Sequence, residues 1–164
     1  MNKLTIKDIA INAMIAAMYF TITYFTQSFA YLNIQFRIAE ILLLLCFYNR
    51  KYVIGVTLGC LLANITSPLG WPDMVFGTLA TLSSAILISY SKRLWLAGIW
   101  PVLLNGVVVG LELHILLELP FWISGLEVVA GELVVLVVGV IIFYFLQRYK
   151  GFLAAIDAKQ NIPE

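Results

Sequence analysis

The feature that most constrains this chain is a succession of six apolar segments separated by short polar breaks. Hydrophobic residues make up 62% of the 164 residues and charged residues only 12%, about half the charged share of a typical soluble domain. This composition indicates a chain surrounded largely by hydrocarbon. It argues against a disordered chain, a nucleic-acid binder and a secreted disulfide scaffold. The segments cover about residues 6–25, 36–48, 52–65, 73–90, 94–117 and 121–147.

The segments are expected to be helices rather than the strands of a barrel. The runs 41–46 and 133–138 are continuously apolar, whereas barrel strands alternate between apolar and polar residues. Inside a bilayer, a helix satisfies its own backbone hydrogen bonds. The sequence therefore predicts an all-α membrane protein, with six transmembrane helices in one domain over 1–150 and a short cytoplasmic tail over 151–164.

The second segment is the shortest, with about 13 residues. As an α-helix it would extend about 20 Å, against a hydrocarbon core of about 30 Å. A re-entrant hairpin is the alternative to a full crossing.

The distribution of basic residues favours six crossings with both termini in the cytoplasm. On that topology nine of the ten basic residues lie inside and only Arg37 lies outside, as the positive-inside rule predicts. With five crossings, the basic pairs at 50–51 and 92–93 would lie on opposite sides. The nine inside residues are Lys3, Lys7, Arg50, Lys51, Lys92, Arg93, Arg148, Lys150 and Lys159.

Six of the nine acidic residues lie in the outer half of this bundle or near its middle. A carboxylate at that depth costs a few kcal/mol unless it is paired, neutral or facing water. One outward arginine cannot pair with all six, which predicts an outward-open pocket rich in acceptors for a cationic or donor-rich small molecule. The six are Glu40, Asp73, Glu112, Glu118, Glu127 and Glu132.

Glu112 and Glu132 are the strongest candidates to face a ligand, because both lie in apolar helices without a basic neighbour. Asn105 precedes Glu112 by seven residues and therefore shares its helix face. Glu118 and Glu127 lie near the membrane boundary, where water can solvate them.

The remaining acids also have purely structural interpretations. Arg37 and Glu40 are three residues apart and can pair on one helix face. Asp73 follows Pro72 at a helix start, where a carboxylate stabilises the helix dipole. Either interpretation leaves these residues open as ligand contacts.

Small residues recur at four-residue spacing, which lets helices approach closely in lipid. Gly55, Gly59 and Ala63, and likewise Gly106 and Gly110, are expected to pack inside the bundle. On the first helix, Ala13 and Ala17 can either pack internally or dock another membrane protein.

Cys46 and Cys60 lie in apolar runs and are expected to be small buried hydrophobes. His114 is the only histidine and has no other metal ligands near it in sequence, so we expect no metal and no cofactor. The chain also lacks an ATP-binding loop, a soluble domain and a nucleophile–base pair, so an ion gradient or another subunit must supply energy and catalysis is not expected.

Seven short motifs resemble a known family, the QueT-type substrate-binding (S) components of energy-coupling factor (ECF) transporters. The resemblance spans all but the first helix and the tail. Members of this family tend to carry a proline near the end of the second helix, where this chain has only apolar residues over 42–48. The motifs are Gln35-Phe36-Arg37-x-Ala39-Glu40, Gly59-Cys60-x-x-Ala63-Asn64, Asp73-x-x-Phe76-Gly77-Thr78-Leu79-Ala80-Thr81, Pro101-x-x-x-Asn105, Gly110-x-Glu112-Leu113, Leu119-Pro120-Phe121-Trp122 and Gly131-Glu132.

The resemblance implies a six-helix S-component fold in the cell membrane. It also implies a transmembrane T component and two cytoplasmic ABC ATPases as partners, with Ala13 and Ala17 at the T-component contact. The implied substrate is a queuosine precursor, a 7-deazaguanine such as queuine, preQ1 or preQ0.

A 7-deazaguanine matches the acidic pocket chemically. One carboxylate can accept both N1–H and the exocyclic amine, O6 requires a donor, and the flat face suits Trp122 or Phe36. A cationic aminomethyl group would favour a second carboxylate. The expected substrate-binding residues are Gln35, Arg37, Glu40, Asn64, Asp73, Asn105, Glu112, Trp122 and Glu132.

A stand-alone secondary transporter is the main alternative, with Glu112 and Glu132 as a proton relay. The two functions differ in their energy source. The alternative predicts uptake by this chain alone that an uncoupler abolishes, whereas an S component requires ATPase subunits.

Overall fold

The computed structural model describes residues 5–30 and 35–161, and for residues 29–30 only the backbone. Lys3 and the last three residues of the predicted tail lie outside this part. The described residues form helices and connecting loops without a strand, which confirms the prediction of an all-helical chain.

Four of the described helices are long and apolar enough to cross a membrane. They match the first, fourth, fifth and sixth predicted segments to within two residues at each end. The four are α1 (Ile6–Phe25), α4 (Trp71–Tyr90), α5 (Leu94–Leu117) and α6 (Phe121–Leu146).

The second and third predicted segments are shorter in the structure. They become the 3₁₀-helix η1 and the twelve-residue helix α3, neither of which reaches the length of the four long helices. The shorter elements are α2 (Gln27–Ala30), η1 (Ile38–Phe47), η2 (Arg50–Tyr52), α3 (Val53–Asn64) and α7 (Lys150–Ala155).

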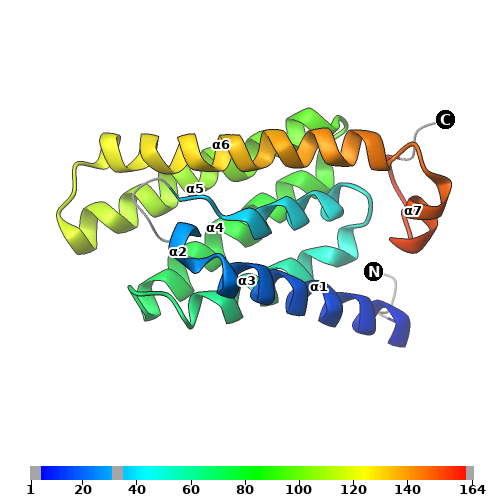
Figure 1. The fold of residues 1–164 in the computed structure, drawn as a ribbon, viewed down its shortest axis with the longest axis horizontal. Coiled ribbons are helices and arrows are strands. Elements are labelled where there is room, and N and C mark those ends of the chain that lie inside the picture. The colour runs from blue at the N-terminus through cyan, green and yellow to red at the C-terminus, as the bar shows by residue number, and fades with distance from the viewer. Residues whose placement is uncertain (1–4, 31–34, 162–164) are drawn as a thin grey trace.

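The helix η1 occupies the middle of the bundle, in contact with α1, α3, α4, α5 and α6 (Figure 1). Leu43, Leu44 and Cys46 are completely buried, as expected for a helix that is apolar on every side. The expectation of an α-helix over 36–48 is wrong, because residues Ile38–Phe47 have the hydrogen bonds of a 3₁₀-helix. This segment is also a single helix and not the hairpin that was its alternative. At about 2.0 Å per residue, a 3₁₀-helix of this length extends about 20 Å.

Glycines allow two pairs of helices to pack backbone against backbone. A Cβ on Gly55 would lie 2.8 Å from the Asn12 carbonyl oxygen of α1, and one on Gly110 would lie 2.8 Å from Gly125 Cα of α6. These contacts confirm that the small residues of α3 and α5 pack inside the bundle. The prediction that Cys46 and Cys60 are buried is also confirmed.

One end of the bundle is held together by polar contacts between segments far apart in sequence. Lys51 Nζ of η2 contacts the Asp8 carboxylate at the start of α1, and Arg50 Nε donates to the Ser89 carbonyl at 3.1 Å. In Figure 1, α7 and the start of α1 lie at this same end. It holds the described basic residues other than Arg37, namely Lys7, Arg50, Lys51, Lys92, Arg93, Arg148, Lys150 and Lys159. We call it the basic end.

The chain after α7 packs onto the basic end. Gln160 Nε2 donates to the carbonyls of Phe47 and Ser89, both at 3.1 Å. Asn161 Nδ2 donates to Phe47 at 2.8 Å and to Ser91 at 3.1 Å. These amides satisfy carbonyls left free where η1 and α4 end, so the predicted tail is a cap of the bundle.

Gly110→Ala should lower the thermal unfolding temperature in detergent. The new Cβ would press on the Gly125 backbone, which lies 2.8–3.1 Å away and cannot yield as a flexible side chain would. Overpacking of this kind costs about 1–3 kcal/mol. Gly151→Ala is the matched control, because nothing lies within 4 Å of its Cβ position and alanine favours a helix. Equal melting of both variants would contradict the close approach of α5 and α6.

Candidate functional site

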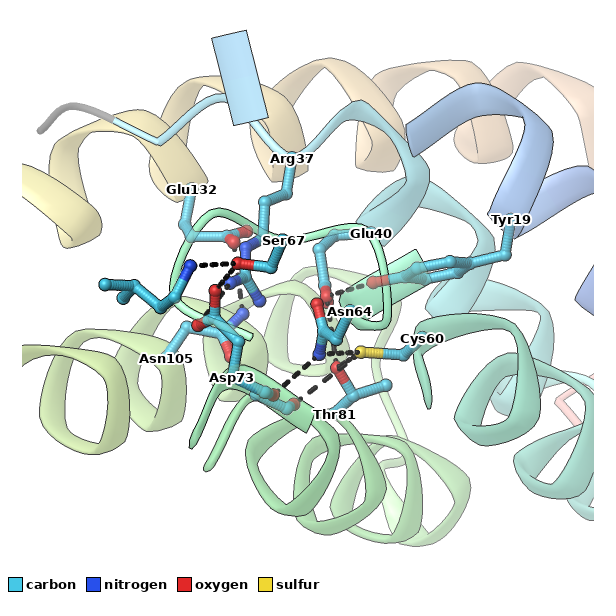
Figure 2. Close-up of polar contacts among 12 residues, drawn as sticks. Tyr19, Arg37, Glu40, Cys60, Asn64, Ser67, Asp73, Thr81, Asn105 and Glu132 are labelled. Atoms are coloured by element: carbon cyan, nitrogen blue, oxygen red, sulfur yellow. Dashed lines mark hydrogen bonds and ion pairs between the residues drawn. The ribbon is translucent and has the colours of Figure 1, made fainter. Parts of the chain in front are cut away.

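Buried polar side chains gather in the half of the bundle opposite the basic end, where η1 and α4 begin. Figure 2 shows the polar contacts among several of them. They come from η1, α3, α4, α5, α6 and the α3–α4 loop, and each is almost completely shielded from solvent. We call this group the polar cluster. Its members are Arg37, Glu40, Asn64, Ser67, Asp73, Thr81, Asn105, Glu112 and Glu132.

Arg37 joins η1 to the start of α4. It is the N-cap residue of η1, and its Nη2 lies 4.0 Å from Asp73 Oδ1, with both side chains about 4% exposed or less. The Ser67 hydroxyl also contacts the Asp73 carboxylate, and Asn64 Nδ2 donates to the Asp73 carbonyl at 2.9 Å. Asp73 therefore does more than stabilise a helix dipole, because it ties the α3–α4 loop to η1.

Glu40 lies one 3₁₀ turn after Arg37, so the two side chains leave η1 on the same face. Its Oε1 accepts a hydrogen bond from Tyr19 Oη of α1 at 2.6 Å. Thr81 Oγ1 of α4 lies 3.2 Å from the same oxygen and 3.2 Å from Cys60 Sγ. Glu40 thus connects three helices.

The sequence did not single out Tyr19, Ser67 or Thr81. A buried tyrosine hydroxyl usually has a polar partner. A tyrosine inside an apolar helix, such as Tyr19, could therefore have indicated a buried polar site. Thr81 belongs to one of the family motifs. Ser67 carried no comparable signal.

Asn105 of α5 and Glu132 of α6 face each other, a pairing between two helices that the predicted stripe of Asn105 and Glu112 on one helix did not include. Asn105 Nδ2 donates to Glu132 Oε1 at 3.1 Å. A Cβ on the adjacent Gly131 would lie 2.3 Å from the Gln35 carbonyl oxygen. Only glycine at this position lets the Gln35 backbone approach α6 so closely.

Several buried oxygens of this region receive no hydrogen bond from the described residues. Both carboxylate oxygens of Glu112 are among them, although Glu112 interacts electrostatically with Asp73 and Arg37. Buried polar atoms are normally hydrogen-bonded, so this excess of acceptors points to a ligand that brings donors. The oxygens are Gln35 Oε1, Glu40 Oε2, Asn105 Oδ1, Glu112 Oε1, Glu112 Oε2 and Glu132 Oε2.

Three residues that were predicted to contact the substrate or a partner protein lie on the surface. Trp122 is 78% exposed and packs against Phe121, with ring centroids 5.0 Å apart, so the structure does not bring it to the polar cluster. Ala13 and Ala17 are also exposed on α1, while their neighbour Ala16 is buried against α3. The small-residue strip of α1 is therefore accessible to another membrane protein.

Charge distinguishes the polar cluster from an ordinary core. Four carboxyl groups, those of Glu40, Asp73, Glu112 and Glu132, surround the single guanidinium of Arg37. Such a site favours ligands that are cationic or rich in N–H donors, because each donor offsets part of the cost of burying a carboxylate.

Comparison with known proteins agrees with the apolar helices and with the family that the motifs indicated. A family model described as QueT transporter matches residues 9–148, a range that includes every member of the polar cluster. The chain is also 31% identical over 159 residues to "Queuosine precursor transporter QueT" of Lactococcus lactis subsp. cremoris (strain MG1363), covering 87% of this chain and 93% of that relative. No solved structure matches the chain. The chain therefore belongs to the QueT transporter family, as its motifs indicated, and is a multi-pass membrane protein.

Proposed function

We propose that this chain is the membrane-embedded S component of an ECF importer and that it binds a queuosine precursor in the polar cluster. The observation that carries the proposal is the concentration, around one arginine, of buried acceptors that receive no hydrogen bond from the described residues. The name of the Lactococcus lactis relative supports the same substrate class.

Each feature of a 7-deazaguanine has a counterpart in the cluster. Glu112 suits N1–H and the exocyclic amine, because both its oxygens lack donors from the described residues and one carboxylate can accept two parallel hydrogen bonds. Arg37 suits O6, since a guanidinium carries five N–H donors. Glu132 has one oxygen left beside Asn105 and suits the cationic aminomethyl group of preQ1.

The remaining polar residues complete the proposed pocket. We include no stacking contact from Trp122, because its ring lies on the surface. The proposed ligand-facing residues are Gln35, Arg37, Glu40, Asn64, Asp73, Asn105, Glu112 and Glu132.

The proposal includes six crossings, with η1 and α3 as the two short ones, and places the basic end in the cytoplasm of the cell. The accumulation of basic residues at one end supports this orientation. The polar cluster then lies in the outer half of the bundle, where a ligand can enter from outside.

An S component requires a T component and two ATPases. We place the T component on the exposed strip of α1 that holds Ala13 and Ala17. Small residues there permit close helix contact.

Uptake measurements separate this function from a proton-coupled transporter, which the buried carboxyls also permit. Cells that carry this chain with T and ATPase components should accumulate labelled preQ1, and deletion of the ATPases should abolish uptake. Uptake by the chain alone that an uncoupler stops would favour the secondary transporter.

Glu112→Gln should weaken the binding of every 7-deazaguanine precursor. The amide replaces one acceptor by a donor that faces a ligand donor, a mismatch worth about 2–4 kcal/mol or about 30- to 1000-fold in affinity. Glu132→Gln should weaken preQ1 more than uncharged preQ0, because the variant removes the charge but can still accept from Asn105. Calorimetric titration of each purified variant measures both effects.

Glu118→Gln is the control. Because Glu118 is exposed, this substitution should leave the affinities for preQ1 and preQ0 unchanged. Thermal melts of the same samples separate lost binding from lost folding. If both deep variants bind like wild type, the base edge is read elsewhere in the cluster, and Glu40 and Asp73 become the next candidates.

Ala17→Leu should weaken assembly with the T component while ligand affinity and melting temperature stay unchanged, because this side chain is exposed. Ala16→Leu should instead lower the melting temperature, since Gly59 of α3 packs directly on Ala16. Co-purification with the T component and ligand titration distinguish the two. Normal assembly of the Ala17→Leu variant would move the T-component contact to another face.

A further inference from the structure

An apolar groove follows the outer surface of α5 and α6 from the basic end toward the middle of the bundle. It consists of a cavity of about 930 Å³ at the basic end and a second of about 370 Å³ farther along. The two share Trp95, Val140 and Ile141 in their linings. We call them together the α5–α6 groove.

The length of the groove matches one leaflet of a bilayer. Along α5 it extends from Arg93 to Leu103, which is about 15 Å at 1.5 Å per residue. That is half of a hydrocarbon core about 30 Å thick. The exposed apolar side chains of Ile99, Leu103 and Val137 line its deeper part.

The basic end of the groove is built to attract an anion. Lys92 and Arg93 are exposed there, and neither forms an ion pair with a carboxylate of the described chain. The helix α5 begins at the next residue without a side-chain cap and without an acidic residue in its first turn. Its first amide groups and the positive end of its dipole therefore also favour negative charge.

Two aromatic side chains mark the level of the membrane surface at the same place. Trp95 and Tyr144 line the cavity beside the two cations and are each about half exposed. Amphipathic rings of this kind concentrate at the boundary between headgroups and acyl chains. The groove thus has a polar, cationic mouth and an apolar body in the order that a phospholipid requires.

We propose that the α5–α6 groove binds one anionic phospholipid from the leaflet at the basic end. Lys92, Arg93 and the first amides of α5 contact the headgroup phosphate, and one acyl chain lies along the groove as far as Leu103. Basic pockets between membrane helices are known to select acidic headgroups. The headgroup end of this groove lies at the opposite end of the bundle from the polar cluster, and the proposal does not depend on the substrate.

Native mass spectrometry with phosphatidylglycerol and phosphatidylcholine tests the headgroup contact. The wild-type protein should prefer phosphatidylglycerol, and Lys92→Gln/Arg93→Gln should weaken that binding about thirty-fold, which corresponds to about 1 kcal/mol for each charge. Lys7→Gln/Lys150→Gln removes the same charge from exposed positions at the same end outside the groove and should bind like wild type. Equal binding of the two lipids, or equal losses in the two double variants, would overturn the proposal.

A second pair of measurements tests the acyl chain. Val137→Trp should fill the groove and weaken phosphatidylglycerol binding several-fold, with Leu133→Trp as the substitute if the first variant melts early. Glycerol phosphate, which has the headgroup charge but no chain, should not bind detectably. Undiminished lipid binding by a folded tryptophan variant, or equal binding of glycerol phosphate, would overturn the assignment of the groove.

Discussion

Burial of four carboxyl groups around one guanidinium is the constraint on which this structure depends. Each ionised carboxylate inside the bundle costs several kcal/mol unless donors surround it, and the donors present come from different helices. Tyr19 of α1 and Thr81 of α4 contact Glu40, while Asn105 of α5 contacts Glu132. The packing of the helices therefore also determines how well these carboxyl groups are satisfied, because displacement of α1, α4 or α5 would remove a donor from one of them.

Under the proposed function, the acceptors without protein donors are the groups that hold the ligand. A core that satisfied every oxygen would have no remaining acceptors for the donors of a ligand. Glu112 is the clearest example, because it is fully buried without a donor among the described residues. Under the proposed function, the ligand supplies the donors that Glu112 lacks, in line with the general departure from full consistency at sites of function.

Hydropathy and helical spacing were sufficient to predict the four long helices and the internal packing of the small residues of α3 and α5. These features depend on local pattern. The pairing of Arg37 with Asp73 and the capping of η1 by Gln160 join positions far apart in sequence, so no local pattern specifies them. Trp122 was placed by its depth in the membrane, which does not determine the face of the helix from which it projects.

The 3₁₀ geometry of η1 gives the site a mechanical connection to the opposite end of the molecule. With three residues per turn, Arg37, Glu40 and Cys46 stand in one row, and Cys46 and Phe47 receive the capping contacts at the basic end. Conversion to α-helical hydrogen bonds would shorten ten residues by about 5 Å and turn Arg37 about half a revolution relative to Cys46. The pitch of one short helix therefore fixes both the depth and the direction of Arg37, the one cation of the polar cluster among the described residues.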